Sequence, residues 1–200
     1  MKKTIVISSL LVIFAIAATI LLWPYFTTHI LVIKGDNIQT VSIQSGADTV
    51  SYSDLSAVRI PNDGTVTLSY TVDDEDYSDG SIVVKGSEAE VTIRPDYSLT
   101  KRQEVAKGAY KVVSARLAEL YPKINLYSIA PGDVYERGSW YSTTLTYTGD
   151  YGLNSDTLRI VAKNDGDSWN LETLPEIFLT TAKYSDIPVG VLQQANKYSN

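Results

Sequence analysis

The densest group of side chains with ligand chemistry is an acidic run near the middle of the chain. Hard cations such as Ca²⁺ bind several carboxylate oxygens held close together, so the run is a candidate calcium site. An EF-hand is excluded, because a loop starting at Asp74 would place Lys85 where the bidentate glutamate belongs. The alternative is a solvated hairpin tip whose charges discourage strand pairing. The candidate calcium ligands, and the only cofactor site that the sequence suggests, are Asp73, Asp74, Asp76 and Asp79.

A second group with binding chemistry is aromatic and lies in the C-terminal half of the chain. Flat aromatic faces can stack on sugars or hold peptides. Alternation along residues 140–147 puts Trp140 and Tyr141 on opposite faces of a strand, so at most one is expected to face the core. The alternative is ordinary core and half-buried packing, which is common for aromatic residues in sheets. The candidate ligand-binding residues are Trp140, Tyr141, Tyr151 and Trp169.

Catalytic chemistry is poorly represented in the chain. His29 is the only histidine, and no nucleophile motif lies near it, whereas serine and cysteine triads usually need a histidine base. The absence of cysteine excludes disulfides, zinc–thiolate sites and cysteine nucleophiles. No glycine-rich phosphate loop occurs. We therefore expect a protein that is not an enzyme; a hydrolase acting through two carboxylates is the remaining catalytic alternative.

The elements that would carry these residues begin with an apolar segment at residues 5–22, which contains no charge. It predicts a transmembrane helix at residues 5–23 after a cytoplasmic start at residues 1–4, because Lys2 and Lys3 precede it and Trp23 follows it. The interpretation is a signal anchor that contacts membrane lipid through residues 5–23, making a single-pass cell-membrane protein with extracytoplasmic C-terminal domains. The alternative is a cleaved signal peptide with an Ala-x-Ala site at Ala15 and Ala17.

Residues 29–95 alternate between apolar and polar positions, most clearly at Val66, Leu68, Tyr70 and Val72. Strict alternation indicates strands with one buried and one wet face, which is typical of antiparallel sheets. The turn sequence at residues 62–64, Asn-Asp-Gly, separates two of the runs. We expect an acidic, all-β domain, either a small sandwich or a barrel.

The strand rhythm of residues 42–48, 60–70 and 77–93, with glycines at 80 and 86, resembles PEGA domains of bacterial surface proteins. The Pro-Glu-Gly-Ala motif that gives those domains their name is absent. The resemblance implies a small extracytoplasmic β module and carries no site residues.

Residues 99–200 predict an α+β domain in which a helix packs on an antiparallel sheet. Thr100 and Gln103 fit a capping box for a helix over residues 101–120. Strands are expected at residues 140–147, 158–162, 169–171 and 177–181, and a short helix after Asp186. This order of elements is similar to that of cystatin-like and NTF2-like accessory domains, which host many functions.

The charge distribution narrows the class of partner. Net charge is −6, and acidic residues outnumber basic ones over residues 24–98, while residues 99–200 are balanced. An acidic surface argues against nucleic acid as a partner. The sequence predicts a non-enzymatic, membrane-anchored extracytoplasmic module that binds a protein partner as an accessory or scaffolding subunit of a bacterial envelope complex. The alternative is a cell-surface glycan- or peptide-binding protein that uses the aromatic face.

Overall fold

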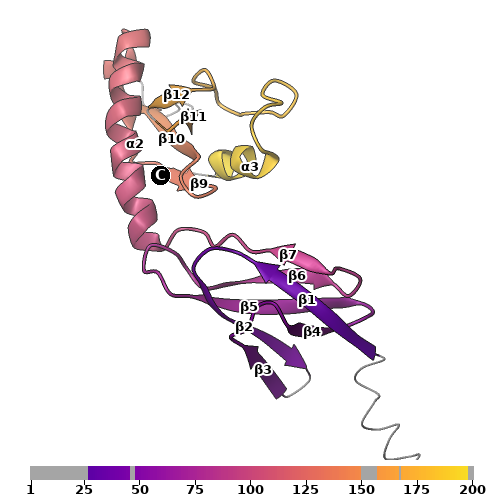
Figure 1. Cartoon of the computed structure of the whole chain (residues 1–200). Helices are drawn as coiled ribbons and strands as arrows, with labels where there is room; N and C mark the ends of the chain where they lie inside the picture. The colour runs from indigo at the N-terminus through magenta and orange to yellow at the C-terminus, as the bar shows by residue number, and fades with distance from the viewer. Residues whose placement is uncertain (1–26, 46–47, 150–156, 167, 198–200) are drawn as a thin grey trace, which may run out of the picture. The chain divides into compact units, whose positions relative to one another are not determined.

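The computed structural model describes residues 27–45, 48–149, 157–166 and 168–197 (Figure 1). The chain divides into two compact units at the bond between Pro95 and Asp96, and we call these unit 1 and unit 2. Each unit is described by itself below.

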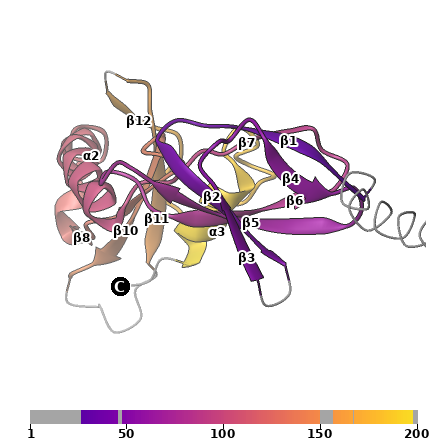
Figure 2. The same ribbon diagram turned by 60° about the horizontal axis from the view of Figure 1, so that its bottom comes forward.

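Unit 1 contains two β-sheets. The strand order is β4-β1-β7 in one sheet and β3-β2-β5-β6 in the other, where β2 lies between β3 and β5 (Figure 2). β1 is antiparallel to β4 but parallel to β7, whereas the sequence predicted antiparallel pairing. Alternation reports which face of a strand is buried and not the direction of its neighbour. The strands are β1 (Thr28–Lys34), β2 (Ile38–Ser45), β3 (Asp48–Tyr52), β4 (Val58–Pro61), β5 (Thr65–Val72), β6 (Gly80–Lys85) and β7 (Glu90–Thr92).

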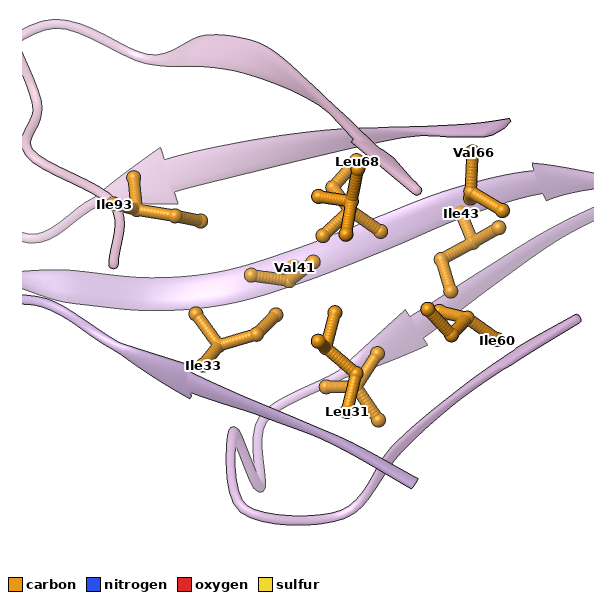
Figure 3. Packing of buried hydrophobic residues seen from close by; sticks show 10 residues of the cluster. Leu31, Ile33, Val41, Ile43, Ile60, Val66, Leu68 and Ile93 are labelled. Atoms are coloured by element: carbon orange, nitrogen blue, oxygen red, sulfur yellow. The ribbon is translucent and has the colours of Figure 1, made fainter. Parts of the chain in front are cut away.

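The core of unit 1 is aliphatic and lies between the two sheets. Figure 3 shows Leu31 and Ile60 of the three-stranded sheet facing Leu68 of the four-stranded sheet. Each of these side chains alternates with an exposed neighbour along its strand. The arrangement is a sandwich, with one buried and one wet face on each sheet. Its buried residues are Leu31, Ile33, Val41, Ile43, Val58, Ile60, Val66, Leu68, Val84 and Ile93.

The predicted turn at residues 62–64 joins β4 to β5 as expected. Gly64 has φ +81°, a left-handed conformation that glycine adopts without the steric cost of a Cβ atom. The N–H of Gly86 donates to the carbonyl of Gly64 at 2.8 Å, which ties this turn to the end of β6.

Unit 2 has a sheet between two helices. The strand order is β12-β11-β10-β8. Strands β8 and β9 lie along the same edge of β10, where β9 pairs with residues 140–142 and β8 with residues 145–147. Figure 1 shows α2 and α3 on opposite sides of these strands. The elements are α2 (Leu99–Leu120), η1 (Ile124–Leu126), β8 (Tyr127–Ile129), β9 (Asp133–Tyr135), β10 (Trp140–Tyr147), β11 (Leu158–Asn164), β12 (Trp169–Leu171) and α3 (Val189–Lys197).

The long helix α2 begins slightly earlier than the sequence predicted. Its N-cap is Ser98, whose hydroxyl accepts from the N–H of Lys101 at 3.4 Å, and not Thr100. Val112 and Leu120 are apolar but exposed, so the buried stripe of the helix is narrow. The buried residues follow helical spacing and are Ala106, Ala109, Val113 and Leu117.

The second face of the sheet is covered by α3 and by the irregular segment 173–188. The predicted strand at residues 177–181 is wrong, because this segment forms no ladder there. Instead, the side-chain amide of Asn196 holds Leu179 by accepting from its N–H at 3.0 Å and donating to its carbonyl at 2.8 Å. The helix predicted after Asp186 is present as α3 and buries Val191, Leu192 and Ala195.

The fold class predicted from the sequence is corrected by this architecture. Across the described ranges the protein is mostly β, with several sheets, and none of the helices there is long and apolar enough to cross a membrane. The longest of them, α2, carries lysine and arginine along its length. The predicted transmembrane helix at residues 5–23 lies outside the described residues, so the assignment as a membrane protein with a signal anchor has no support.

Candidate binding site

The aromatic candidates are divided between two cores. Trp140 is 6% exposed and packs with α3, while Tyr141 is fully buried on the α2 side. Tyr141 donates to the carbonyl of Pro131 at 2.9 Å and meets the half-buried Trp169 edge to face, with ring centroids 5.9 Å apart. Tyr151 lies outside the described residues. Of the candidates, Trp140 and Tyr141 are therefore core packing groups, and Trp169 packs against Tyr141.

The reason is that β10 is buried on both faces. Ser142 and Thr144 lie on the same face as Trp140, and both are buried although they are polar. The hydroxyl of Ser142 donates to that of Tyr135 at 3.2 Å, and the hydroxyl of Thr143 donates to the carbonyl of Ala130 at 2.6 Å. Hydroxyl side chains can be buried when they are hydrogen-bonded, so this strand combines a polar sequence with core positions.

Two of the four acidic candidates, Asp74 and Asp79, accept hydrogen bonds from backbone N–H groups at their own turn. The carboxylate of Asp74 accepts from the N–H of Asp76 at 2.9 Å and from the amide of Asn37 at 3.2 Å. The carboxylate of Asp79 accepts from the N–H of Val72 at 2.9 Å, and Asp73 is exposed. Among the residues that the structure describes, no group of three or more histidine or acidic side chains could hold a metal. The turn geometry therefore gives the calcium interpretation no support.

His29 joins β1 to two turns of unit 1. Its Nε2 lies 2.8 Å from the carbonyl oxygen of Glu88, so this nitrogen donates, and its Nδ1 lies 3.1 Å from the side chain of Asn62. Both ring nitrogens are engaged in local structure. This arrangement ties β1 to the neighbouring turns of the sandwich.

A polar cleft of about 550 Å³ lies in unit 2 between the start of α2, β9 and α3. The guanidinium of Arg102 pairs with the carboxylate of Asp133 inside it. Glu136, which also lines the cleft, has φ +50°, a conformation that is uncommon for residues other than glycine. Charges of both signs line the walls, and the ion pair uses one of each. The cleft is polar and internally compensated, so it selects no obvious charge of ligand.

An apolar groove of about 350 Å³ opens where α2 ends. The extended backbone of Tyr121, which precedes a proline, stops the helix before it covers the end of the sheet. Leu145 of β10 lies at the groove and is fully buried by its other neighbours. Among the described residues that line the groove, Lys123 is the only charged one; they are Tyr121, Lys123, Ile124, Tyr127, Leu145, Leu158, Leu174 and Pro175.

One wall of the groove is made by an outward loop of the chain beside β11. Glu172 donates its N–H to the carbonyl of Val161, and Glu176 exchanges backbone hydrogen bonds with Arg159. Three residues, 173–175, therefore lie opposite the single residue Ile160 of β11. The Val161 N–H donates to the hydroxyl of Thr173 at 2.9 Å, where a regular ladder would offer a backbone carbonyl. The surplus residues project outward, which leaves Leu174 56% exposed.

A charged cluster fixes the chain that follows this loop. The carboxylate of Glu176 accepts hydrogen bonds from Lys183 and from the hydroxyl of Tyr184, the latter at 2.8 Å. These bonds, the one from Lys183 first, lower the pKa of Glu176 below its ordinary value and raise that of Lys183. A second hollow of about 320 Å³ lies beside the cluster and shares Tyr121 and Leu174 with the groove. The apolar surface thus continues on both sides of Leu174.

Comparisons with known proteins do not assign this site. Neither a protein-family model, nor a curated protein, nor a solved structure matches the chain significantly. The resemblances to PEGA domains and to cystatin-like or NTF2-like domains stay untested by them. The groove was also missed by the sequence analysis. Its only signals are the Tyr-Pro and Leu-Pro pairs at residues 121–122 and 174–175, which mark a helix end and an extended segment.

Proposed function

We propose that the protein is a non-enzymatic binding module that acts as an accessory or scaffolding subunit of a protein complex. The observation that carries this proposal is the apolar groove of unit 2, with the exposed side chain of Leu174 at its edge. Apolar groups gathered around a small hollow favour a protein interface, where an anchor side chain fills a pocket and its neighbours exclude water.

The size and lining of the groove favour an apolar side chain of a partner segment as its occupant. About 350 Å³ is at the lower end of the range for small-molecule pockets, and the neighbouring hollow continues the apolar surface beyond it. Full burial of one aliphatic or aromatic side chain contributes about 1.5–3 kcal/mol. Because Lys123 is the only charged residue among the described ones that line the groove, an acidic residue beside the anchor would be favoured in the partner.

The test uses photo-cross-linking from two positions of equal exposure. Benzoylphenylalanine replaces either Leu174 at the groove or Val189 at the start of α3, and each native side chain is 56% exposed. Each full-length variant is expressed in its native cell, irradiated, and the cross-linked proteins are identified by mass spectrometry. We expect one partner that cross-links from position 174 and not from position 189.

A charge substitution measures the groove's contribution once that partner is purified. Leu174→Glu should weaken the affinity about tenfold to a hundredfold, because it places a charge where an apolar anchor is buried. Val189→Glu, which adds the same charge at equal exposure, should leave the affinity within about twofold. Equal cross-linking from both positions, or equal effects of the two substitutions, would refute the groove as the binding site.

A further inference from the structure

Strand β6 forms an open edge of the four-stranded sheet in unit 1. It pairs with β5 on one side, and no described strand lies on its other side. Such edges present unpaired backbone groups to solvent and are templates for pairing with another strand. The side chain of Val83, in the middle of β6, is 65% exposed. Valine is among the residues that are most often buried, so this exposure would be relieved if another chain covered the edge.

The ladder between β5 and β6 fixes which backbone groups face outward. The N–H of Gly86 donates to the carbonyl of Gly64, one step beyond the pair of Thr65 and Lys85. Hydrogen-bonded and non-hydrogen-bonded pairs alternate in an antiparallel ladder, so Ile82 and Val84 bond to β5. Ser81 and Val83 therefore direct their N–H and C=O groups to the open edge, and no described backbone group bonds to them there.

Edge strand β4 of the other sheet offers a contrast. The N–H of Asn62 donates to the carbonyl of Thr27, so by the same alternation Ile60 bonds to β1 while Arg59 and Pro61 face outward. Pro61 has no N–H, and the hydroxyl of Tyr52 lies 3.5 Å from the outward carbonyl of Arg59. A proline is a common protection of an edge strand, and β6 has none.

We propose that β6 pairs antiparallel with β6 of a second copy of this chain. In the register that places Ser81 opposite Val83 of the second copy, Asp79 lies opposite Lys85, and symmetry forms this pair twice. Asp79 and Lys85 are both exposed, and the Asp79 carboxylate uses only one oxygen in its bond to the N–H of Val72. Shifting the register by one hydrogen-bonded step in either direction removes this charge complementarity.

The same register brings the two copies of Ile82 together on the inner face. Ile82 is only partly buried within one chain and packs against the sandwich core. Pairing would continue the four-stranded sheet into the second copy and extend the aliphatic core across the contact. On the outer face, Val83 of each copy would lie beside Ser81 of the other. The two pairs of Asp79 with Lys85 would flank them. An isologous contact of this kind closes on itself and produces a dimer.

The first test compares the mass of the full-length chain with that of two lysine variants by sedimentation velocity over a range of concentrations. Val83→Lys adds charge beside the open edge and leaves the ladder to β5 intact. Thr49→Lys adds the same charge on β3, the opposite edge of the same sheet, where residue 49 is also exposed. We expect a dimer for the native chain and for Thr49→Lys, and at least a tenfold weaker dimer for Val83→Lys. A monomeric native chain, or a dimer that Val83→Lys leaves unchanged, would overturn the proposal.

Complementary charge variants test the register. Lys85→Glu places two acids opposite each other in a dimer, and Asp79→Lys places two lysines opposite each other, so each variant alone should be monomeric. Mixing the two should restore a heterodimer, because each contact then joins opposite charges. Variants that stay monomeric on mixing would refute the register.

A disulfide experiment tests the register without relying on charge. The chain has no cysteine, so an introduced pair reports a single contact. Directly opposite residues of an antiparallel pair are close enough for a disulfide. Oxidising a mixture of Ser81→Cys and Val83→Cys chains should yield mainly the mixed disulfide dimer. Mainly homodisulfides, or no disulfide dimer, would contradict the register. These readouts concern unit 1, so their failure leaves the groove of unit 2 untouched.

Discussion

The two units bury their strands in different ways. In unit 1 each sheet has one aliphatic face in the core and one polar face in water. Strand β5 is an example, because the buried Val66 and Leu68 alternate with exposed threonine and serine residues. In unit 2 the central strand β10 is buried on both faces, although Ser142 and Thr144 occupy one of them. Burial can therefore be deduced from alternation only where one face of the sheet stays wet.

The largest expected effect tests whether the second face of β10 is a true core. Trp140→Ala should destabilise unit 2 by about 3–5 kcal/mol, because it opens a cavity between the sheet and α3. An exposed aromatic platform would instead tolerate the change within about 0.5 kcal/mol. The measurement is the free energy of unfolding from urea denaturation of the full-length chain.

Leu68→Ala provides the matched control for this experiment. Leu68 is fully buried in unit 1, and its truncation should cost about 2–5 kcal/mol in that unit. If the units unfold separately, each variant should shift its own transition. A Trp140→Ala chain as stable as the native chain would show that the α3 side is not a packed core.

The fold of unit 1 could be predicted from the sequence more fully than that of unit 2. In unit 1 the strand positions around Val66 and Leu68 and the turn at residues 62–64 could be deduced, because an aliphatic residue at every second position has one physical interpretation. The parallel pairing of β1 with β7 could not, since it depends on where the chain returns to the sheet.

The candidate site depends on features that carry almost no sequence signal. Trp140 was predicted as a ligand-binding residue because it belongs to a group of aromatic residues whose flat faces could stack on a ligand, and only the packing of α3 shows that it is buried. The groove arises from where α2 stops, which the Tyr-Pro pair marks, and from the surplus residues beside Ile160, which tertiary hydrogen bonds place. The local sequence pattern therefore predicted where helices and strands lie, but it did not predict the groove that remains uncovered between them.

A smaller effect is expected from hydroxyl groups, which should matter in unit 2 and not in unit 1. Thr143→Val removes the donor to the buried carbonyl of Ala130 while conserving shape, and should cost about 1–3 kcal/mol. Thr67→Val makes the same change on the wet face of β5, where Thr67 is exposed, and should stay within about 0.5 kcal/mol. Urea denaturation measures both. Equal costs would contradict the difference between the two sheets.

The smallest effect concerns the pH dependence of the segment that covers the second face of unit 2. Hydrogen bonds from Lys183 and then Tyr184 lower the pKa of Glu176, so its stabilising contribution is present above the ordinary value of 4.5 and is lost as the pH falls through the lower folded value. Lys183 has a raised pKa, so its contribution is present below the ordinary value of 10.5 and is lost as the pH rises through the higher folded value. The cluster is largely solvated, which keeps the effect small.

The measurement is the hydrogen-exchange protection factor of the Leu179 N–H, which bonds to Asn196 in the same cover. Dividing the intrinsic exchange rate by the observed rate removes the pH dependence of the exchange chemistry itself. The protection factor should be largest between these limits and should fall at acid pH. Glu176→Gln should abolish the decrease at acid pH. Glu172→Gln should retain it, because Glu172 bonds to Val161 of β11 through its backbone N–H, which the substitution leaves intact. A decrease at acid pH that persists in Glu176→Gln would show that Glu176 does not cause it. A native chain without this decrease would show that packing of Leu179 and Ile187 holds the cover, as the aliphatic core holds unit 1.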